Sequence, residues 1–308
     1  MFFQREKYTL LTLFISLSFY AQKSSISSYK IDYNILFNGE TLLDEGIASL
    51  KQNYTENYWE ILPAIEGFDF SITNSSPTEL FKIPEEKAIK AIQKSNKKDV
   101  AARDRAYLLL GKSRFYDQRY ISALQSFNNI ENSFFIREYW KALVYITIDQ
   151  NELAYKVIEK ALNHKSARKE EKKFLDLALI QYYINVKNYD KAVKSLVEFL
   201  TSNNDKKLEA RLNYVLAQIY LEKNESEKAK TAFKSVINSG INKSHSLILW
   251  SKLIHNNLIN SPDHNLFKKL IRSERYRENI SLINYFNAKL LLNSQPKQAE
   301  NQIGRAHV

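Results

Sequence analysis

Side chains that could do acid–base or metal chemistry are scattered along this chain. Histidine is a common general base and metal ligand, and none of the five histidines stands in a metal-binding spacing such as HExxH. The nearest approach to a cluster is His255, Asp263 and His264, but Pro262 places the last two in a turn. We interpret these three side chains as residues of a solvated loop.

Other signatures of catalysis are also missing from the sequence. The absence of cysteine excludes thiol catalysis, disulfides, thiolate zinc sites and iron–sulfur clusters. There is no glycine-rich phosphate loop, no GxSxG turn and no dinucleotide fingerprint. Most carboxylates lie among lysines, as on polar helix faces, where solvated ion pairs are ordinary. The sequence therefore predicts a non-enzymatic protein without catalytic residues, metal or cofactor.

The composition favours helices as the elements of the fold. Six glycines and five prolines make up about 4% of 308 residues, roughly a third of the usual share. β-Sandwiches, barrels and propellers need these residues at most of their turns. Because 44% of the residues are hydrophobic, a core can form, and we expect an all-α protein.

An amphipathic helix pair is clearest between residues 208 and 237. The first apolar stripe has helical spacing and comprises Leu212, Val215, Leu216, Ile219 and Tyr220. Asn224 is expected to cap the next helix, with Glu227 completing a capping box. The second helix carries the matching stripe Ala229, Phe233, Val236 and Ile237.

Small and aromatic residues recur in this pattern with a regular period. Ala217 and Ala229 stand where two helices would cross, and Gly111 with Ala123 and Phe127 form an earlier copy. The crossing alanines are spaced by 31, 38 and 37 residues, near the ~34 of a tetratricopeptide repeat: Ala123, Ala154, Ala192 and Ala229. We predict an α-solenoid of tetratricopeptide-like helix–turn–helix repeats over residues 22–302, clearest in 104–237. The alternative is an irregular helical bundle.

Flanking segments are expected to extend the same array. Residues 41–52 and 85–94 have helical patterns, and Pro84 suits the first position of the second helix. Residues 67–84 form the longest irregular stretch and are expected to be a loop. Residues 247–258 and 281–292 are further expected helices.

A solenoid offers a binding surface in place of a catalytic site. The first helix of each pair lines the concave side of such an array, and arginine and tyrosine dominate many protein-binding hot spots. The predicted register points seven residues into this groove as candidate partner-binding residues: Arg105, Lys112, Tyr139, Gln181, Arg211, Tyr214 and Gln218.

The N-terminus has the layout of an export signal. Two basic residues precede the uncharged run LLTLFISLSF, and Ala21 is the expected cleavage site. Residues 1–21 are therefore predicted to be a signal peptide that directs the chain to the periplasm or cell envelope. The alternative is a short membrane anchor. Downstream no run approaches transmembrane length, so the mature chain is expected to have no membrane span.

The net charge of +11 invites a nucleic-acid interpretation, which the pattern does not favour. The 45 lysines and arginines are spread along the chain, without an arginine-rich block or a nucleic-acid-binding motif. We therefore expect a solvated basic surface and no nucleic-acid partner.

Several strings resemble a known family beyond the general repeat. They are YKIDYNILFNGETLLDEGIASL, NYWEILP, EEKAIKAIQKS and AYLLLGKSRFYDQRYISALQSFN, in that order. Over residues 29–128 the chain resembles the N-terminal region of the SprE/PorW-type tetratricopeptide lipoproteins of Bacteroidota. The resemblance implies a role in type IX protein secretion and gliding motility.

Two departures from that family bear on what the resemblance implies. Members carry a cysteine after the hydrophobic run and are much longer, whereas this chain has no cysteine and therefore no predicted lipid anchor. Residues 303–308, IGRAHV, match the translation of the common sequencing-adapter read ATC GGA AGA GCA CAC GTC. We interpret 303–308 as a non-native tail and the chain as a fragment.

The function expected from the sequence is that of a non-enzymatic envelope scaffold. It would bind other envelope proteins, such as secretion or motility machinery, through the groove and without a covalent step. The alternative is the extracytoplasmic repeat domain of a truncated sensor kinase or transcriptional regulator. A membrane span and kinase motifs downstream would select the alternative, and further helical repeats would select the scaffold.

Overall fold

The computed structural model describes most of the chain between residues 29 and 238. The described residues are 29–54, 56–57, 60–69, 78–96, 98–238, 288, 296–297 and 300. Several predicted features lie outside them: the signal peptide (1–21), His255 with Asp263 and His264, the helix at 247–258, nearly all of the helix at 281–292, and the tail (303–308).

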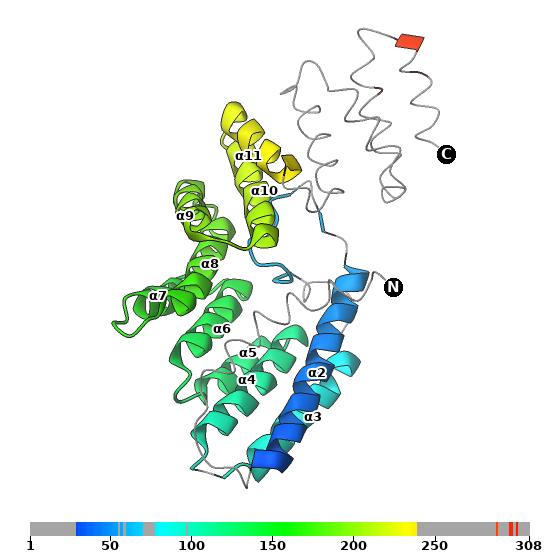
Figure 1. The fold of residues 1–308 in the computed structure, drawn as a ribbon, viewed down its shortest axis with the longest axis vertical. Helices are drawn as coiled ribbons and strands as arrows, with labels where there is room; N and C mark the ends of the chain where they lie inside the picture. The colour runs from blue at the N-terminus through cyan, green and yellow to red at the C-terminus, as the bar shows by residue number, and fades with distance from the viewer. Residues whose placement is uncertain are drawn as a thin grey trace. The chain divides into compact units, whose positions relative to one another are not determined.

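The described residues form ten α-helices and contain no β-strand, which confirms the predicted all-α class (Figure 1). Helices that are neighbours in the sequence pack against each other, as α2 does with α3, α4 with α5, α6 with α7 and α10 with α11. Their bounds are α2 Tyr29–Asn53, α3 Thr78–Lys94, α4 Val100–Tyr116, α5 Tyr120–Asn128, α6 Phe134–Thr147, α7 Asn151–Leu162, α8 Lys169–Asn185, α9 Tyr189–Ser202, α10 Lys206–Glu222 and α11 Ser226–Asn238.

The chain divides into two compact units. Unit 1 comprises Met1–Tyr54 and Gly67–Ala178, and its described part holds α2 to α7 with the first part of α8. Unit 2 comprises Thr55–Glu66 and Leu179–Val308, and its described helices are the rest of α8, α9, α10 and α11. The short segment Thr55–Glu66 therefore packs with helices that lie more than a hundred residues further along the chain.

The same turn joins the helices of four successive pairs. In the α4–α5 turn, the N–H of Gln118 donates to the Phe115 carbonyl (3.0 Å) and the N–H of Arg119 donates to the Arg114 carbonyl (2.9 Å). This Schellman arrangement ends a helix with one residue in the left-handed region. The α6–α7, α8–α9 and α10–α11 turns repeat the same hydrogen bonds. The left-handed residues are Gln118 (φ 61°), Asp149 (56°), Lys187 (55°) and Asn224 (59°).

The predicted small residues are buried, and one of them lies at a close approach of two helices. The crossing alanines follow the left-handed residues by five positions, and all four are 0% exposed: Ala123, Ala154, Ala192 and Ala229. Gly111 on α4 faces Phe127 on α5 so closely that an added Cβ would lie 2.3 Å from the phenylalanine ring. Close approach of the helices thus depends on residues with little or no side chain, as the pattern predicted.

The predicted starts of α2 and α3 were wrong, whereas their predicted ends agree with the structure to within one residue. Helix α2 begins at Tyr29 and not near residue 41, because Leu36, Leu43 and Leu50 form one buried stripe seven residues apart. Helix α3 begins at Thr78, so Pro84 lies inside it and the predicted loop (67–84) is shorter. An interior proline costs about 3 kcal/mol, and burial of Phe81 in the first turns of α3 offsets much of that.

The predicted capping role of Asn224 was also wrong. Asn224 is the left-handed residue that ends α10, and α11 begins two residues later at Ser226. The sequence signal was ambiguous because asparagine is favoured both at helix N-caps and in the left-handed region.

Replacing Lys187 with glycine should stabilise the protein. An L-residue in the left-handed region is strained by about 1 kcal/mol, and glycine removes that strain at an exposed site. We expect the free energy of unfolding, measured by urea denaturation, to rise by about 0.5 kcal/mol for Lys187→Gly. The control Lys194→Gly, on the exposed face of α9, should lower it by about 1 kcal/mol. If both variants lost the same free energy of unfolding, Lys187 would not carry the strain of the left-handed turn.

Gly111→Ala should destabilise the protein, although alanine is the better helix former. The added methyl group would overlap the Phe127 ring, and overpacking of this kind costs about 1–3 kcal/mol. Thermal unfolding should show a lower midpoint for Gly111→Ala, and part of that loss should disappear in the Phe127→Leu background. A higher midpoint for the single variant would show that the crossing has room for a side chain.

Candidate functional site

The segment Thr55–Glu66, called here the inserted segment, lies against α8 and α10 within unit 2 (Figure 1). Its sequence is TENYWEILPAIE, and residues 56–57 and 60–66 are described and are not helical. Leu62 and Ala64 are buried, whereas the residues on either side of each are partly exposed. Residues 61–63 have no regular structure, and the chain turns before them, where the Glu60 N–H donates to the Asn57 carbonyl at 3.1 Å.

Gln218 on α10 holds the inserted segment by its backbone. The Leu62 N–H donates to Gln218 Oε1 at 2.9 Å, and Gln218 Nε2 donates to the Glu60 carbonyl. A glutamine amide has both a donor and an acceptor, so it can bind one N–H and one C=O as a neighbouring strand would. Because only 3% of Gln218 is exposed, these bonds supply partners that the buried amide needs.

Arg211 lies about two turns before Gln218 on the same face of α10 and binds the segment in two ways. Its Nε donates to the Pro63 carbonyl at 3.0 Å, and its Nη1 pairs with Glu56 Oε1 at 2.6 Å. The side chains of Arg211 and Glu56 are only 10% and 12% exposed, so this ion pair is largely removed from water. Arg211 Nη2 is buried and has no hydrogen-bond partner.

Two further side chains extend the site. Gln181 on α8 is buried, and its Oε1 accepts a hydrogen bond from the Ile65 N–H at 3.4 Å. Lys207 Nζ, at the start of α10, lies 3.5 Å from Glu66 Oε2 in a more exposed ion pair. The site therefore binds backbone groups of residues 60–65 and the carboxylates that precede and follow them in the sequence.

The structure brings three of the seven predicted groove residues onto the inserted segment: Gln181, Arg211 and Gln218. Tyr214 is buried in unit 2, and its ring lies edge-on to Phe233 of α11 at 6.1 Å between centroids. Lys207 was not predicted, since one lysine among many carries no sequence signal. The inserted segment itself was visible as the string NYWEILP, which the packing of repeats does not require.

The other three predicted groove residues join helices within unit 1. Arg105 on α4 donates to both carboxylate oxygens of Glu40 on α2, and its Nε lies 2.6 Å from Glu40 Oε1. Lys112 Nζ lies 5.3 Å from the centre of the Trp140 ring. Burial lowers the pKa of Lys112, and the nearby negative charge of Asp44 only partly offsets this effect.

Tyr139 on α6 is buried in the same unit. Its ring lies edge-on to Trp140 and to Phe174, at 5.7 and 5.8 Å between centroids. Burial raises the pKa of Tyr139, so its hydroxyl stays protonated at neutral pH. These aromatic contacts bind α6 to α8 inside unit 1.

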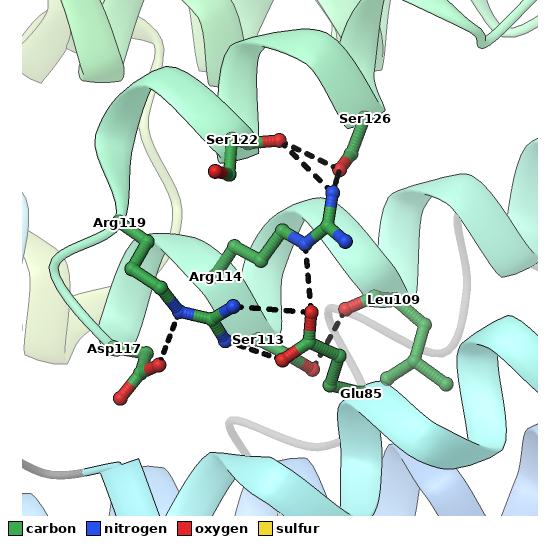
Figure 2. A network of polar contacts seen from close by, with 8 residues as sticks. All are labelled: Glu85, Leu109, Ser113, Arg114, Asp117, Arg119, Ser122 and Ser126. Carbon is green, nitrogen blue, oxygen red and sulfur yellow. Dashed lines mark hydrogen bonds and ion pairs between the residues drawn. The ribbon is translucent and has the colours of Figure 1, made fainter.

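A second polar cluster, also in unit 1, connects α3, α4 and α5 (Figure 2). Glu85 on α3 accepts hydrogen bonds from Arg114 Nε at 2.8 Å and from Arg119 Nη1 at 3.2 Å. Arg114 also donates to Ser126 Oγ on α5 at 3.0 Å, and Arg119 donates to the buried carboxylate of Asp117. Because every member pairs with another, we interpret this cluster as a structural joint.

Comparisons with known proteins assign no family. No family model matches the chain, and no curated protein matches it. In the part of the chain that the structure describes, no helix combines the length and the apolar character needed to cross a membrane.

The Glu85 cluster should make stability depend on pH in the acid range. Burial alone would raise the pKa of Glu85, but its bonds to Arg119 and Arg114 outweigh burial and lower it. Stability from Glu85 is therefore present above its unfolded pKa and is lost as pH falls through the lower folded pKa.

We expect the urea midpoint of the unchanged protein to fall between about pH 5 and pH 3 more steeply than that of Glu85→Gln. Glu86→Gln, on the exposed side of α3, is the matched control and should retain the steep fall. Parallel curves for the protein and Glu85→Gln would contradict this assignment.

Proposed function

We propose that this chain is a non-enzymatic scaffold of tetratricopeptide-like repeats that binds partner proteins. The four turns of identical geometry, spaced by 31, 38 and 37 residues, support the repeat assignment. So do the four buried alanines with the same spacing, close to the ~34 residues of that repeat.

The observation that carries the proposal is the way in which α8 and α10 hold the inserted segment. Arg211, Gln218 and Gln181 bind its backbone N–H and C=O groups, which are the same in every extended peptide. A helix face with this chemistry is suited to grip an extended stretch of another protein. Binding of this kind needs directed hydrogen bonds and buried apolar side chains, and no covalent step.

The cellular setting we propose comes from the N-terminal pattern and the family resemblance. Export through the predicted signal peptide (1–21) would place the scaffold in the periplasm or cell envelope. The resemblance over residues 29–128 supports a role in type IX protein secretion and gliding motility, and the string NYWEILP in that stretch belongs to the inserted segment. The partners would be other envelope proteins, such as secretion or motility machinery.

Deletion and co-purification test this function. Deletion of its gene should impair type IX cargo release and gliding. From envelope fractions, the tagged protein should recover specific partners, and Arg211→Ala with Gln218→Ala should lower that recovery about tenfold, as loss of two hot-spot residues would. Tyr214 is unsuitable for this test because its replacement would also remove core packing.

The matched control is Lys194→Ala on the exposed face of α9, which should recover partners as the unchanged protein does. Normal secretion and gliding after deletion would refute the cellular role. Equal recovery by the double variant, with an unchanged helical circular dichroism spectrum, would refute the binding site.

A further inference from the structure

The contacts of the inserted segment describe the ligand that the α8 and α10 face selects. The segment offers a carboxylate at each end, Glu56 to Arg211 and Glu66 to Lys207. Between them, Leu62 and Ala64 are buried two positions apart, while the backbone around them bonds to Gln218 and Gln181. The chemistry is that of an acidic peptide with two apolar side chains at alternate positions and a turn that lets one arginine contact Glu56 and Pro63 together.

We propose that the inserted segment is an internal occupant of a peptide-binding site, and that a partner's acidic segment of the same chemistry displaces it. This inference rests on the proposed scaffold function and adds the class of ligand and the way in which access to the site is controlled. In the isolated chain the inserted segment would occupy the site. A partner would bind only by competing for the same contacts.

The internal occupant uses the site incompletely, which makes it replaceable. Glu56 accepts from Arg211 Nη1, whereas the buried Nη2 of Arg211 has no hydrogen-bond partner. A guanidinium binds a carboxylate best through two parallel hydrogen bonds, and an unpaired buried donor is unfavourable. A partner whose carboxylate reached a second nitrogen of Arg211 would therefore make a contact that the inserted segment does not make.

The attachment of the inserted segment also suits reversible occupancy. The residues that flank it, Tyr54 and Asp69, belong to unit 1, and the Tyr54 hydroxyl donates to the Asp69 carboxylate across the base of the loop. The segment can then leave α10 while its two ends stay held together. A short tether gives an effective concentration on the order of millimolar, so occupancy in cis would weaken the apparent affinity for free peptide.

The experiment measures binding of a synthetic peptide, TENYWEILPAIE with an N-terminal fluorescein, to the full chain by fluorescence anisotropy. The opened variant, Glu56→Gln with Leu62→Ala, weakens the internal occupant without touching α8 or α10. We expect it to bind the peptide about tenfold or more tightly than the unchanged chain. Adding Arg211→Met and Gln218→Leu to the opened variant should abolish binding.

The matched control is Glu152→Gln with Leu153→Ala, the same two chemical changes at exposed positions of α7 in unit 1. It should bind the peptide no better than the unchanged chain. Equal affinity of the opened variant and this control would overturn the proposal, as would binding that survives the loss of Arg211 and Gln218.

Hydrogen exchange of the unchanged chain keeps the test decisive if the opened variant unfolds. The Leu62 amide, bonded to Gln218, should exchange about tenfold or more faster than the Leu216 amide in α10, and excess peptide should accelerate it further. Exchange of both amides at the same rate would mean that the segment leaves only when unit 2 unfolds, which would overturn displacement. If recovery of partners from envelope fractions still depended on Arg211 and Gln218, the scaffold function would be supported even though displacement was refuted.

Discussion

The constraint on which unit 2 depends is the need of buried polar side chains for partners. Gln181 and Gln218 are each 3% exposed, and the Arg211 guanidinium lies beside Gln218. Helices alone cannot satisfy these groups, because helical backbone N–H and C=O groups already bond within the helix. A non-helical segment can, since its backbone is unpaired until it meets them. The inserted segment is therefore both a ligand of this surface and part of the core of unit 2.

Unit 1 satisfies its polar helix faces differently. Arg105 pairs with Glu40 across α4 and α2, and Arg114 with Arg119 surrounds Glu85 between α3 and the α4–α5 turn. These ion pairs fix specific helices to each other, and buried Asp104 on α4 accepts from the backbone N–H groups of residues 131–133. In unit 2, amides on α8 and α10 together with Arg211 hold a segment that is distant in the sequence.

The local part of this structure could be predicted from the sequence, and the long-range part could not. Buried alanines and the Gly111 crossing follow from periodic patterns within forty residues. The left-handed turns escaped prediction because Gln118, Asp149, Lys187 and Asn224 share a backbone conformation and no residue type. Periodicity placed Arg211 and Gln218 on one face of the same helix, but no local pattern could reveal that Gln218 would bind a residue 156 positions earlier in the same chain.

The chemistry of the inserted segment distinguishes recognition from simple filling of a core. Hydrophobic residues of similar volume usually stabilise a core as well as a buried ion pair does, because charges lose their hydration on burial. A segment selected only to complete unit 2 would therefore have little need of Glu56 opposite Arg211, least of all with one guanidinium nitrogen left unpaired. A buried charge pair and amides that bind backbone groups instead fix the register and direction of the inserted segment against α10.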